Sequence, residues 1–436
     1  MKYASPMSVQ AYGLGDTTAN ERSAFRKITL RFLLPVALLT FVNAIDRMNV
    51  SFAGAAMSRD LGMSPTQFGT GVSLFFVAYL LFQYPHALLL RSWGARRWFL
   101  VSVMGWGACS FAMAFVTSPW QFHAVRFLLG TAEAGFAPGM TYLIGRWTPA
   151  HARGRALAIA LAAVPVALVM GGPLCGALLS MSNPMDMPGW RWMFFAAAWP
   201  NVLLAVVAYF YFDDSPAEAR WLTPAEKRLL DDAPVSATQP AARSPLRLRD
   251  SRLWRCAGVW GGVMTGSYAL VYWLPQLVRQ LAADRGEFAI AVLSAVPQAG
   301  IAAGLLLNAW HSDRTGERFR HVSLGALLGG IALVVAAVLP SGVATLALLT
   351  VAGLGIGAAQ GVFWTLPGAL QPGGDRPPVE AIAFISMFGT AGGIVGPYVM
   401  GALVDATGRF AAGIAVFAAL LLLGAALVHS LHRSRR

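Results

Sequence analysis

The sequence has few charged residues. Asp, Glu, Lys and Arg make up 12% of the 436 residues, whereas hydrophobic residues make up 56%, and the mean hydropathy is +0.57. An ordinary soluble domain devotes about a quarter of its residues to charge, because polar groups must cover its surface. This chain cannot cover such a surface, so a soluble protein built around one buried core is excluded.

Cysteine is also scarce, and histidines and acids do not cluster. Cys109, Cys175 and Cys256 are widely spaced and lie in or beside apolar runs, so we predict buried, inert thiols rather than disulfides or a metal site. An intramembrane metal enzyme would need clusters of His and acidic residues on facing helices, which the sequence lacks. We therefore expect neither a metal nor a cofactor, and no enzymatic activity.

Long apolar runs, in contrast, recur along the whole length. Many reach the ~20 residues that a helix needs to cross the ~30 Å hydrocarbon layer of a bilayer. The first thirty residues lack the short apolar core and cleavage site of a signal peptide, so the first helix is expected to act as its own targeting signal. The sequence predicts an all-α membrane protein with twelve transmembrane helices, near residues 31–57, 67–90, 98–117, 120–145, 155–181, 191–212, 254–280, 288–310, 320–339, 343–369, 379–404 and 410–431.

The net charge is +13, but the basic residues do not form one patch interleaved with exposed aromatics, which argues against a nucleic-acid partner. They lie in alternate connections between the apolar runs, and the connections on one side hold 26 of the 33 Lys and Arg residues. The positive-inside rule makes that side cytoplasmic. With twelve spans both termini are then cytoplasmic, and we expect a multi-pass protein of a bacterial inner membrane, surrounded by lipid.

The longest polar break contains Pro, Ser, Ala and mixed charges, and it predicts a linker between two six-helix halves. Within it, Thr223, Pro224 and Glu226 have the residue types of a capped helix start, which predicts a short amphipathic helix on the membrane surface. The predicted organisation is a cytoplasmic arm (1–30), an N-terminal bundle (31–212), the linker (213–252), a C-terminal bundle (253–432) and a cytoplasmic tail (433–436).

Two pairs of short motifs indicate that the halves are repeats of each other. Gly94-Ala95-Arg96-Arg97 follows the second span, and Gly316-Glu317-Arg318-Phe319 follows the eighth. Gly172-Pro173 lies 78 residues after the first motif, and Gly396-Pro397 lies 80 residues after the second. Each match joins spans that are six apart, so the repeat is parallel and the two bundles should be pseudo-symmetric.

Four ionisable residues lie inside the predicted spans: Asp46 and Arg47 in the first, Arg126 and Glu133 in the fourth. Each costs roughly 2.5–3.5 kcal/mol at mid-membrane, which predicts a role in function or pairing. Salt bridges that only lock helices together are the alternative. We expect Arg126 to face the carboxylates and to leave Arg47 for a solute carboxylate, since a guanidinium holds a carboxylate through two hydrogen bonds. The carboxylates are then candidates to carry protons.

Polar and aromatic residues elsewhere in the spans are candidates to line a solute site. Tyr79, Gln83 and His86 form one stripe on the second span, while Asn43 and Asn49 flank Asp46. The second half offers uncharged groups, and for any single one of them packing or interfacial anchoring is the simpler explanation. The solute-binding candidates beside Arg47 are Asn43, Tyr79, Gln83, Tyr272, Gln276, Trp364, Ser386 and Thr390.

Five segments carry a family resemblance: Asp46-Arg47, RFLLGTAEAGFAPG at 126–139, DDSPAEARWLTPAEK at 213–227, HSDRTGER at 311–318 and VFWTLPGAL at 362–370. With them the chain resembles the major facilitator superfamily and, more closely, its anion:cation symporter family, in the branch of tartrate-type and aromatic-carboxylate permeases. The resemblance extends from about residue 30 to about residue 430. It implies two six-helix bundles that rock about a midplane site, with proton-driven uptake of a small organic anion. We expect the monomer to be functional.

The resemblance also implies roles for single residues. Asp46 and Glu133 match the proton-linked carboxylates of sugar-acid carriers, and Arg47 matches the residue that binds the substrate carboxylate. Tyr79 matches a residue that lines the site, and Arg126 matches a buried arginine near the acids. Efflux of a drug or metabolite by proton antiport is the main alternative, and a transporter-like sensor is another.

The cytoplasmic motifs depart from the family pattern. Where the family places an acid followed by Arg, the first copy has Arg91 and Ser92, whereas Asp313 and Arg314 are intact in the second copy. With one copy altered, conformations open to the cytoplasm should be more populated than in a relative with two intact copies. Further departures at Ala44, Ala87, Ser386 and Thr390 leave the solute unidentified. The gating candidates are Arg91, Arg97, Asp313, Arg314 and Arg318.

Overall fold

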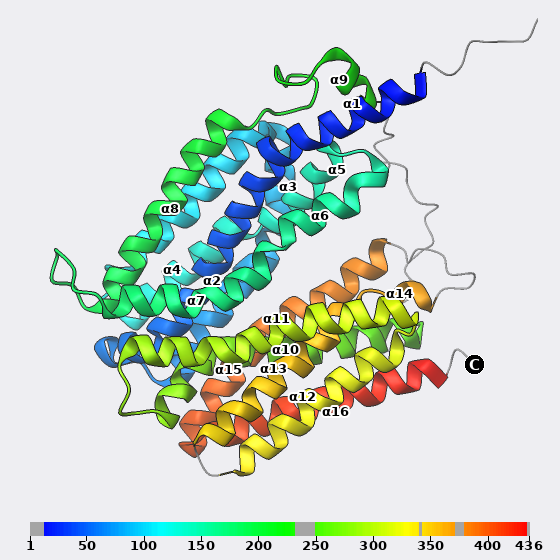
Figure 1. The fold of residues 1–436 in the computed structure, drawn as a ribbon. Coiled ribbons are helices and arrows are strands. Elements are labelled where there is room, and N and C mark those ends of the chain that lie inside the picture. The colour runs from blue at the N-terminus through cyan, green and yellow to red at the C-terminus, as the bar shows by residue number, and fades with distance from the viewer. Residues whose placement is uncertain (1–12, 232–248, 340–341, 371–378, 434–436) are drawn as a thin grey trace, which may run out of the picture.

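A computed structural model describes residues 13–231, 249–339, 342–370 and 379–433. Within these ranges the regular structure is entirely helical, and the helices form two bundles joined by the linker (Figure 1). The N-terminal bundle and the described start of the linker comprise α1 (Gly13–Ile28), a π-helical turn η1 (Thr29–Leu33), α2 (Leu34–Leu61), α3 (Pro65–Met113), α4 (Pro119–Glu133), α5 (Phe136–Trp147), the short turn η2 (Ala150–Ala152), α6 (Arg153–Leu161), α7 (Ala163–Ser180), α8 (Gly189–Tyr211) and α9 (Pro224–Asp231).

The C-terminal bundle is built from fewer, less interrupted helices. They are α10 (Ser251–Leu281), α11 (Glu287–Thr315), α12 (Phe319–Val338), α13 (Val343–Phe363), the single turn α14 (Leu366–Ala369), α15 (Val379–Thr407) and α16 (Phe410–Arg433). We call the end of the molecule that carries α1, α9 and α14 the linker side and the opposite end the far side (Figure 1).

Nine helices of the described chain are long and apolar enough to cross a membrane. Three further passes complete the predicted twelve. The 49-residue α3 holds two passes that meet at a kink at Gly94, α4 and α5 together make one broken pass of 15 and 12 residues, and α10 is a 31-residue pass with more polar residues. The all-helical twelve-pass architecture is therefore confirmed.

The predicted spans are present, and the structure adds how some of them join or break. The spans predicted at 67–90 and 98–117 are not separated by a loop, because the helix resumes immediately after Gly94, whose φ of 78° lies in the left-handed region. A Cβ at this glycine would lie 2.6 Å from Asp214 Oδ1, and that carboxylate accepts the backbone N–H of Arg96 at 2.9 Å. The span predicted at 120–145 is interrupted at Ala134 and Gly135, between α4 and α5.

The two bundles touch through three main helix pairs of the described chain: α3 with α15, α7 with α11, and α2 with α10. The predicted repeat relates each helix of one bundle to a helix of the other. It converts the α3–α15 pair into the α11–α7 pair and leaves the α2–α10 pair unchanged, so the interface has the expected pseudo-twofold symmetry. Its far-side end is tightly packed. Ser73 Oγ donates to the Ile394 carbonyl at 2.5 Å, and a Cβ on Gly69 would lie 2.4 Å from the Pro397 carbonyl oxygen.

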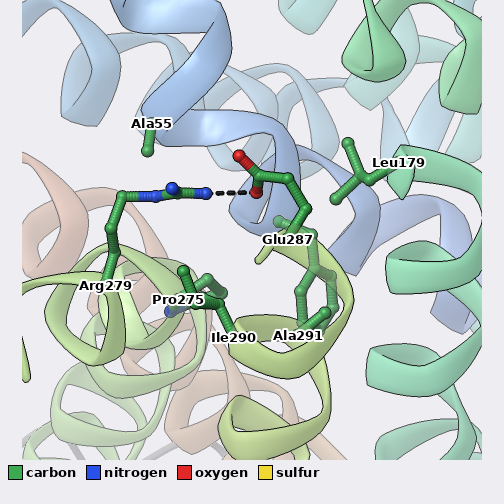
Figure 2. A pocket seen from close by; sticks show the side chains of 8 residues that line it. Ala55, Leu179, Pro275, Arg279, Glu287, Ile290 and Ala291 are labelled. Carbon is green, nitrogen blue, oxygen red and sulfur yellow. Dashed lines mark hydrogen bonds and ion pairs between the residues drawn. The ribbon is translucent and has the colours of Figure 1, made fainter. Parts of the chain in front are cut away.

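An ion pair lies within this far-side contact. Arg279, near the end of α10, pairs with Glu287 at the start of α11, and Figure 2 shows both side chains beside Ala55 of α2 and Leu179 of α7. Both charges belong to the C-terminal bundle, so the pair fixes the α10–α11 corner against which the other bundle packs.

On the linker side the bundles diverge (Figure 1), and the described contacts of the gating motifs stay within one bundle. Asp313 Oδ1 accepts from Arg318 Nη1 at 2.6 Å in the second copy, and Arg314 lies over the ring of Trp310 at 3.9 Å. In the first copy Arg91 and Arg97 are exposed. The structure thus joins the bundles at the far side and separates them at the linker side.

The altered first motif generates a prediction about the equilibrium between conformations that are open and closed on the linker side. Restoring the family pattern with Arg91→Glu and Ser92→Arg should close the linker side, and Asp313→Asn should open it further. We expect a free-energy change of about 1–2 kcal/mol, which alters a two-state ratio roughly fivefold to thirtyfold. Spin-label distances across the linker-side opening measure the shift, with Arg146→Glu as a control for added negative charge. Equal distances in the parent and the restored variant would show that the first motif has no control over gating.

Candidate functional site

The intramembrane charges meet where α2 faces the end of α4. Arg47 Nε donates to Glu133 Oε2 at 2.6 Å, and Asn43 Nδ2 donates to the same oxygen at 2.9 Å. Asn43 and Arg47 are one helical turn apart on α2, so a single face supplies both donors. The Glu133 side chain is 0% exposed and that of Arg47 is 24% exposed. The ion pair therefore has one buried end and one partly open end.

The break after α4 makes the Glu133 carboxylate dependent on this partner. Glu133 is the last residue of α4, where the helix dipole disfavours negative charge. Its second oxygen, Oε1, is buried and lacks a hydrogen-bond partner among the described residues. Arg47 and Asn43 are consequently the groups that compensate the carboxylate.

Arg126 does not occupy the expected position. Its Nε donates to the Gly71 carbonyl at 3.4 Å, its guanidinium lies over the Phe75 ring at 4.7 Å, and its Nη2 has no hydrogen-bond partner in the described chain. The expectation that Arg47 stays free of the carboxylates was wrong. Arg126 forms no ion pair with Glu133 in the described chain, because the two residues lie about 10 Å apart along one helix. Arg47, arriving from α2, reaches the carboxylate instead.

The two guanidinium groups nevertheless share one aromatic wall. The Arg47 guanidinium lies 5.4 Å from the centre of the Phe75 ring and 4.8 Å from that of Tyr79. The Arg126 guanidinium also lies over the Phe75 ring. Two cations thus flank this wall, whereas among the described residues Glu133 is the one acid that forms an ion pair with either of them. The arrangement has an excess of positive charge and favours an anion.

Asp46 points away from this cluster. Its Oδ2 accepts from Asn201 Nδ2 at 2.5 Å, and its Oδ1 accepts from Asn49 Nδ2 at 3.2 Å. Trp106 Nε1 donates to Asn201 Oδ1 at 2.8 Å. Because an indole N–H can only donate, Trp106 fixes the Asn201 amide with its NH₂ toward Asp46. Both Asp46 oxygens therefore act as acceptors, the pattern of a carboxylate.

Sequence reasoning missed Asn201 and Trp106. Asn201 lies in the middle of α8, directly after Pro200, and is completely buried. A lone amide within an otherwise apolar span was the available signal. Of the flanking asparagines, only Asn49 orients Asp46, whereas Asn43 serves Glu133.

Two further predicted residues belong to α10 of the C-terminal bundle. Tyr272 is buried, interacts electrostatically with Arg126 and Arg47, and packs on Phe76 of α3 with ring centres 5.9 Å apart. Gln276, one turn further along α10, lies against Gly54 of α2, and its buried Nε2 has no hydrogen-bond partner among the described residues. Tyr272 therefore places an uncharged group opposite the arginines, and Gln276 lies further toward the far side.

The remaining candidates lie further toward the linker side. Trp364 is 40% exposed and packs against Trp260 at 4.9 Å. Thr390 donates to the Ser386 carbonyl at 3.4 Å, so its hydroxyl is engaged by its own helix, and Gln83 is half-buried. Within the described chain, no hydrogen bond or ion pair joins these four residues to the charged cluster.

The Asp46–Asn201–Trp106 chain generates a stability prediction. Replacing Asn201 with Leu removes one partner from a buried carboxylate and another from a buried indole N–H, which should lower the free energy of unfolding by about 1–3 kcal/mol. The unfolding transition of the purified protein measures this loss. Gln83→Leu, at a half-buried amide, should change stability much less. An Asn201→Leu protein as stable as the parent would contradict the hydrogen-bond chain.

Relatives of this chain with curated names are transporters. The chain is 39% identical over 419 residues to a "Putative tartrate transporter" of Agrobacterium vitis, covering 95% of this chain and 96% of the relative. It is 35% identical over 416 residues to a "Quinolone resistance transporter" of Acinetobacter baumannii, covering 94% and 95% of the two chains.

Solved structures agree at the level of the fold. A bacterial homologue of the human lysosomal transporter Spinster, described as inward-facing and occupied, superposes with a TM-score of 0.74 at 18% identity, covering 92% of this chain and 96% of that one. The family model of the Major Facilitator Superfamily matches residues 36–376. The chain is therefore a multi-pass membrane transporter of small molecules, not an enzyme, and it belongs to the Major Facilitator Superfamily.

Proposed function

We propose that this transporter is a proton-coupled symporter that imports a small organic carboxylate across a bacterial inner membrane by alternating access. The observation that carries the proposal is the ion pair between Arg47 and Glu133 at 2.6 Å. It joins an anion-binding group and a group that can accept a proton at one point between α2 and α4. The proton is the coupling ion, and no cofactor is involved.

Unused hydrogen-bonding groups indicate where the solute binds. Arg126 Nη2 is a buried donor with no partner in the described chain, which costs about 1–3 kcal/mol until an acceptor arrives. A solute carboxylate is such an acceptor. Arg47 and Arg126 both lie over the Phe75 ring, so Arg47 can donate further hydrogen bonds to the same carboxylate. Both arginines therefore belong to the proposed anion site.

Protonation of Glu133 supplies the coupling. A neutral Glu133 no longer forms an ion pair, which releases Arg47 to a solute carboxylate. By linkage, solute binding and protonation then favour each other. A solute and a proton that promote each other's binding move together, which is symport. Asp46 is a second candidate proton carrier, because its described partners are the amides of Asn49 and Asn201 rather than a cation.

The uncharged groups near the arginines support a hydroxylated or aromatic carboxylate. Tyr272 and Tyr79 present phenols near the arginines, and Gln276 adds a buried amide one turn further along α10. Such groups hydrogen-bond to hydroxyls. The relative named as a putative tartrate transporter agrees with a small hydroxy acid. Trp364, Gln83, Ser386 and Thr390 are proposed to contact the solute on its way from the linker side.

The direction of transport and the orientation rest on charge. The linker-side connections carry most of the Lys and Arg residues, so we assign the linker side and both termini to the cytoplasm. The described conformation then opens to the cytoplasm. We propose that the monomer is the functional unit.

Proton-driven efflux is the second candidate, and it is favoured by the relative named as a quinolone resistance transporter. The two functions differ in how solute affinity changes with pH. For symport, acidification strengthens solute binding. For antiport, the solute and the proton compete, so acidification weakens solute binding.

Replacing Arg47 with Lys tests the anion site. An ammonium keeps the charge but loses the planar pair of donors that holds two carboxylate oxygens, so binding of the carboxylate should weaken at least about tenfold. Thermal stabilisation of the purified protein by tartrate, sugar acids, phthalates, hydroxyphenylacetates and nicotinate identifies the solute and then measures its affinity. Arg191→Lys, at a far-side arginine that binds backbone carbonyls, is the control. Unchanged affinity would remove Arg47 from the site.

Replacing Glu133 with Gln tests coupling. The amide keeps the shape of the side chain but cannot gain and lose a proton, so reconstituted protein should exchange solute across the membrane and fail to accumulate it along a pH gradient. Labelled-solute uptake in proteoliposomes, with and without the gradient, separates the two activities. Glu380→Gln, at an exposed acid, should leave both intact. Full gradient-driven accumulation by the Glu133→Gln protein would leave Asp46 as the carrier candidate.

A further inference from the structure

We propose that the transporter carries a binding site for an anionic phospholipid on the linker side, between α1, η1, α6 and α9. A cavity of about 670 Å³ lies there, outside the solute site. One end of it is basic and the other end is apolar. The lining residues that carry the argument are Arg22, Arg26, Leu30, His151, Arg155 and Ile159.

The orientation of α1 is fixed by its attachment to α9. Glu226 accepts from Lys27 Nζ at 2.8 Å and from Ser23 Oγ at 2.7 Å. Burial opposes the charged form of Glu226, but the hydrogen bonds from Lys27, Thr223 and Ser23 outweigh it and lower the pKa of this carboxyl to about 2. The Glu226 carboxylate therefore stays ionised at any physiological pH. The attachment occupies the face of α1 that carries Ser23 and Lys27.

A second face of α1 is buried against the bundle through Ala24 and Ile28. The face that remains carries Arg22, Arg26 and Leu30, which follow one another at intervals of four residues and are all exposed. The cavity is thus bordered by the face of α1 that the described residues leave uncovered.

Along this face the chemistry changes from basic to apolar within one turn. Arg26 and Leu30 are about 6 Å apart along the helix, and the exposed row continues into the bilayer with Leu34 and Leu38, which are 48% and 49% exposed. The opposite wall repeats the change, since Arg155 and Ile159 are also four residues apart on α6. A phosphate headgroup with attached acyl chains has the same order of polarity.

The arginines at the basic end are available to an anion. Arg22, Arg26 and Arg155 form no ion pair in the part of the chain that the structure describes, and Glu21 is the single acid among the described lining residues. The Arg155 guanidinium lies over the Phe25 ring at 4.9 Å. This contact uses the flat face of the guanidinium and leaves its edge N–H groups for phosphate oxygens.

Native mass spectrometry of the full chain in neutral detergent, with added phosphatidylglycerol, tests the proposal. The triple variant Arg22→Gln, Arg26→Gln and Arg155→Gln should bind this lipid roughly a hundredfold more weakly, because each basic residue near an anionic lipid contributes roughly a fivefold factor. The matched control removes three linker-side arginines outside the cavity, Arg146→Gln, Arg220→Gln and Arg433→Gln, and should retain the lipid. Equal lipid binding by the parent and the triple variant would overturn the proposal.

Two further ligands separate a lipid site from a simple phosphate site. Phosphatidylcholine, which has no net charge, should bind at least tenfold more weakly than phosphatidylglycerol, and glycerol 3-phosphate, which has no acyl chains, should not compete with it. Leu30→Ser keeps all three arginines but removes an apolar side chain from the cavity, so it should weaken the binding of phosphatidylglycerol. Competition by glycerol 3-phosphate at similar concentration, or equal binding of the two lipids, would contradict an anionic phospholipid site.

Discussion

The Arg47–Glu133 ion pair is the interaction on which the rest of the site depends. A buried carboxylate at the end of α4 is unfavourable in a medium of low dielectric constant, and removing its partner would leave an uncompensated charge. α2 supplies that partner through Arg47, with Asn43 one turn away. The same pair also limits the freedom of Arg47, because the guanidinium cannot serve Glu133 and a solute carboxylate equally well.

The division of labour between the bundles follows from this constraint. Every ionisable residue of the candidate site lies in the N-terminal bundle, and the C-terminal bundle contributes Tyr272 and Gln276 as neutral partners. The pseudo-symmetric backbone, visible in the pairing of α3 with α15 and of α7 with α11, therefore carries an asymmetric site. In the proposed function, anion binding and proton binding are concentrated in one half, and the other half closes over the solute.

The sequence predicted the features that depend on composition and spacing. Apolar run lengths predicted the twelve passes, and the cost of charge in a membrane singled out Asp46, Arg47, Arg126 and Glu133. It could not decide which arginine reaches Glu133, because that depends on the relative rotation of α2 and α4. The break after Glu133 and the role of Asn201 are likewise tertiary features. An amide in an apolar helix has no preferred partner until Asp46 and Trp106 are brought to it.

Proton uptake on solute binding tests the central claim most directly. Purified protein is mixed with a carboxylate that stabilises it, in a weakly buffered solution that contains a pH indicator. The starting pH is the midpoint of the change in solute affinity with pH. If solute takes Arg47 from Glu133, the freed carboxylate binds a proton, and the solution should become more alkaline in proportion to occupied sites. Release of protons, or solute binding with no proton change at any pH, would contradict the account.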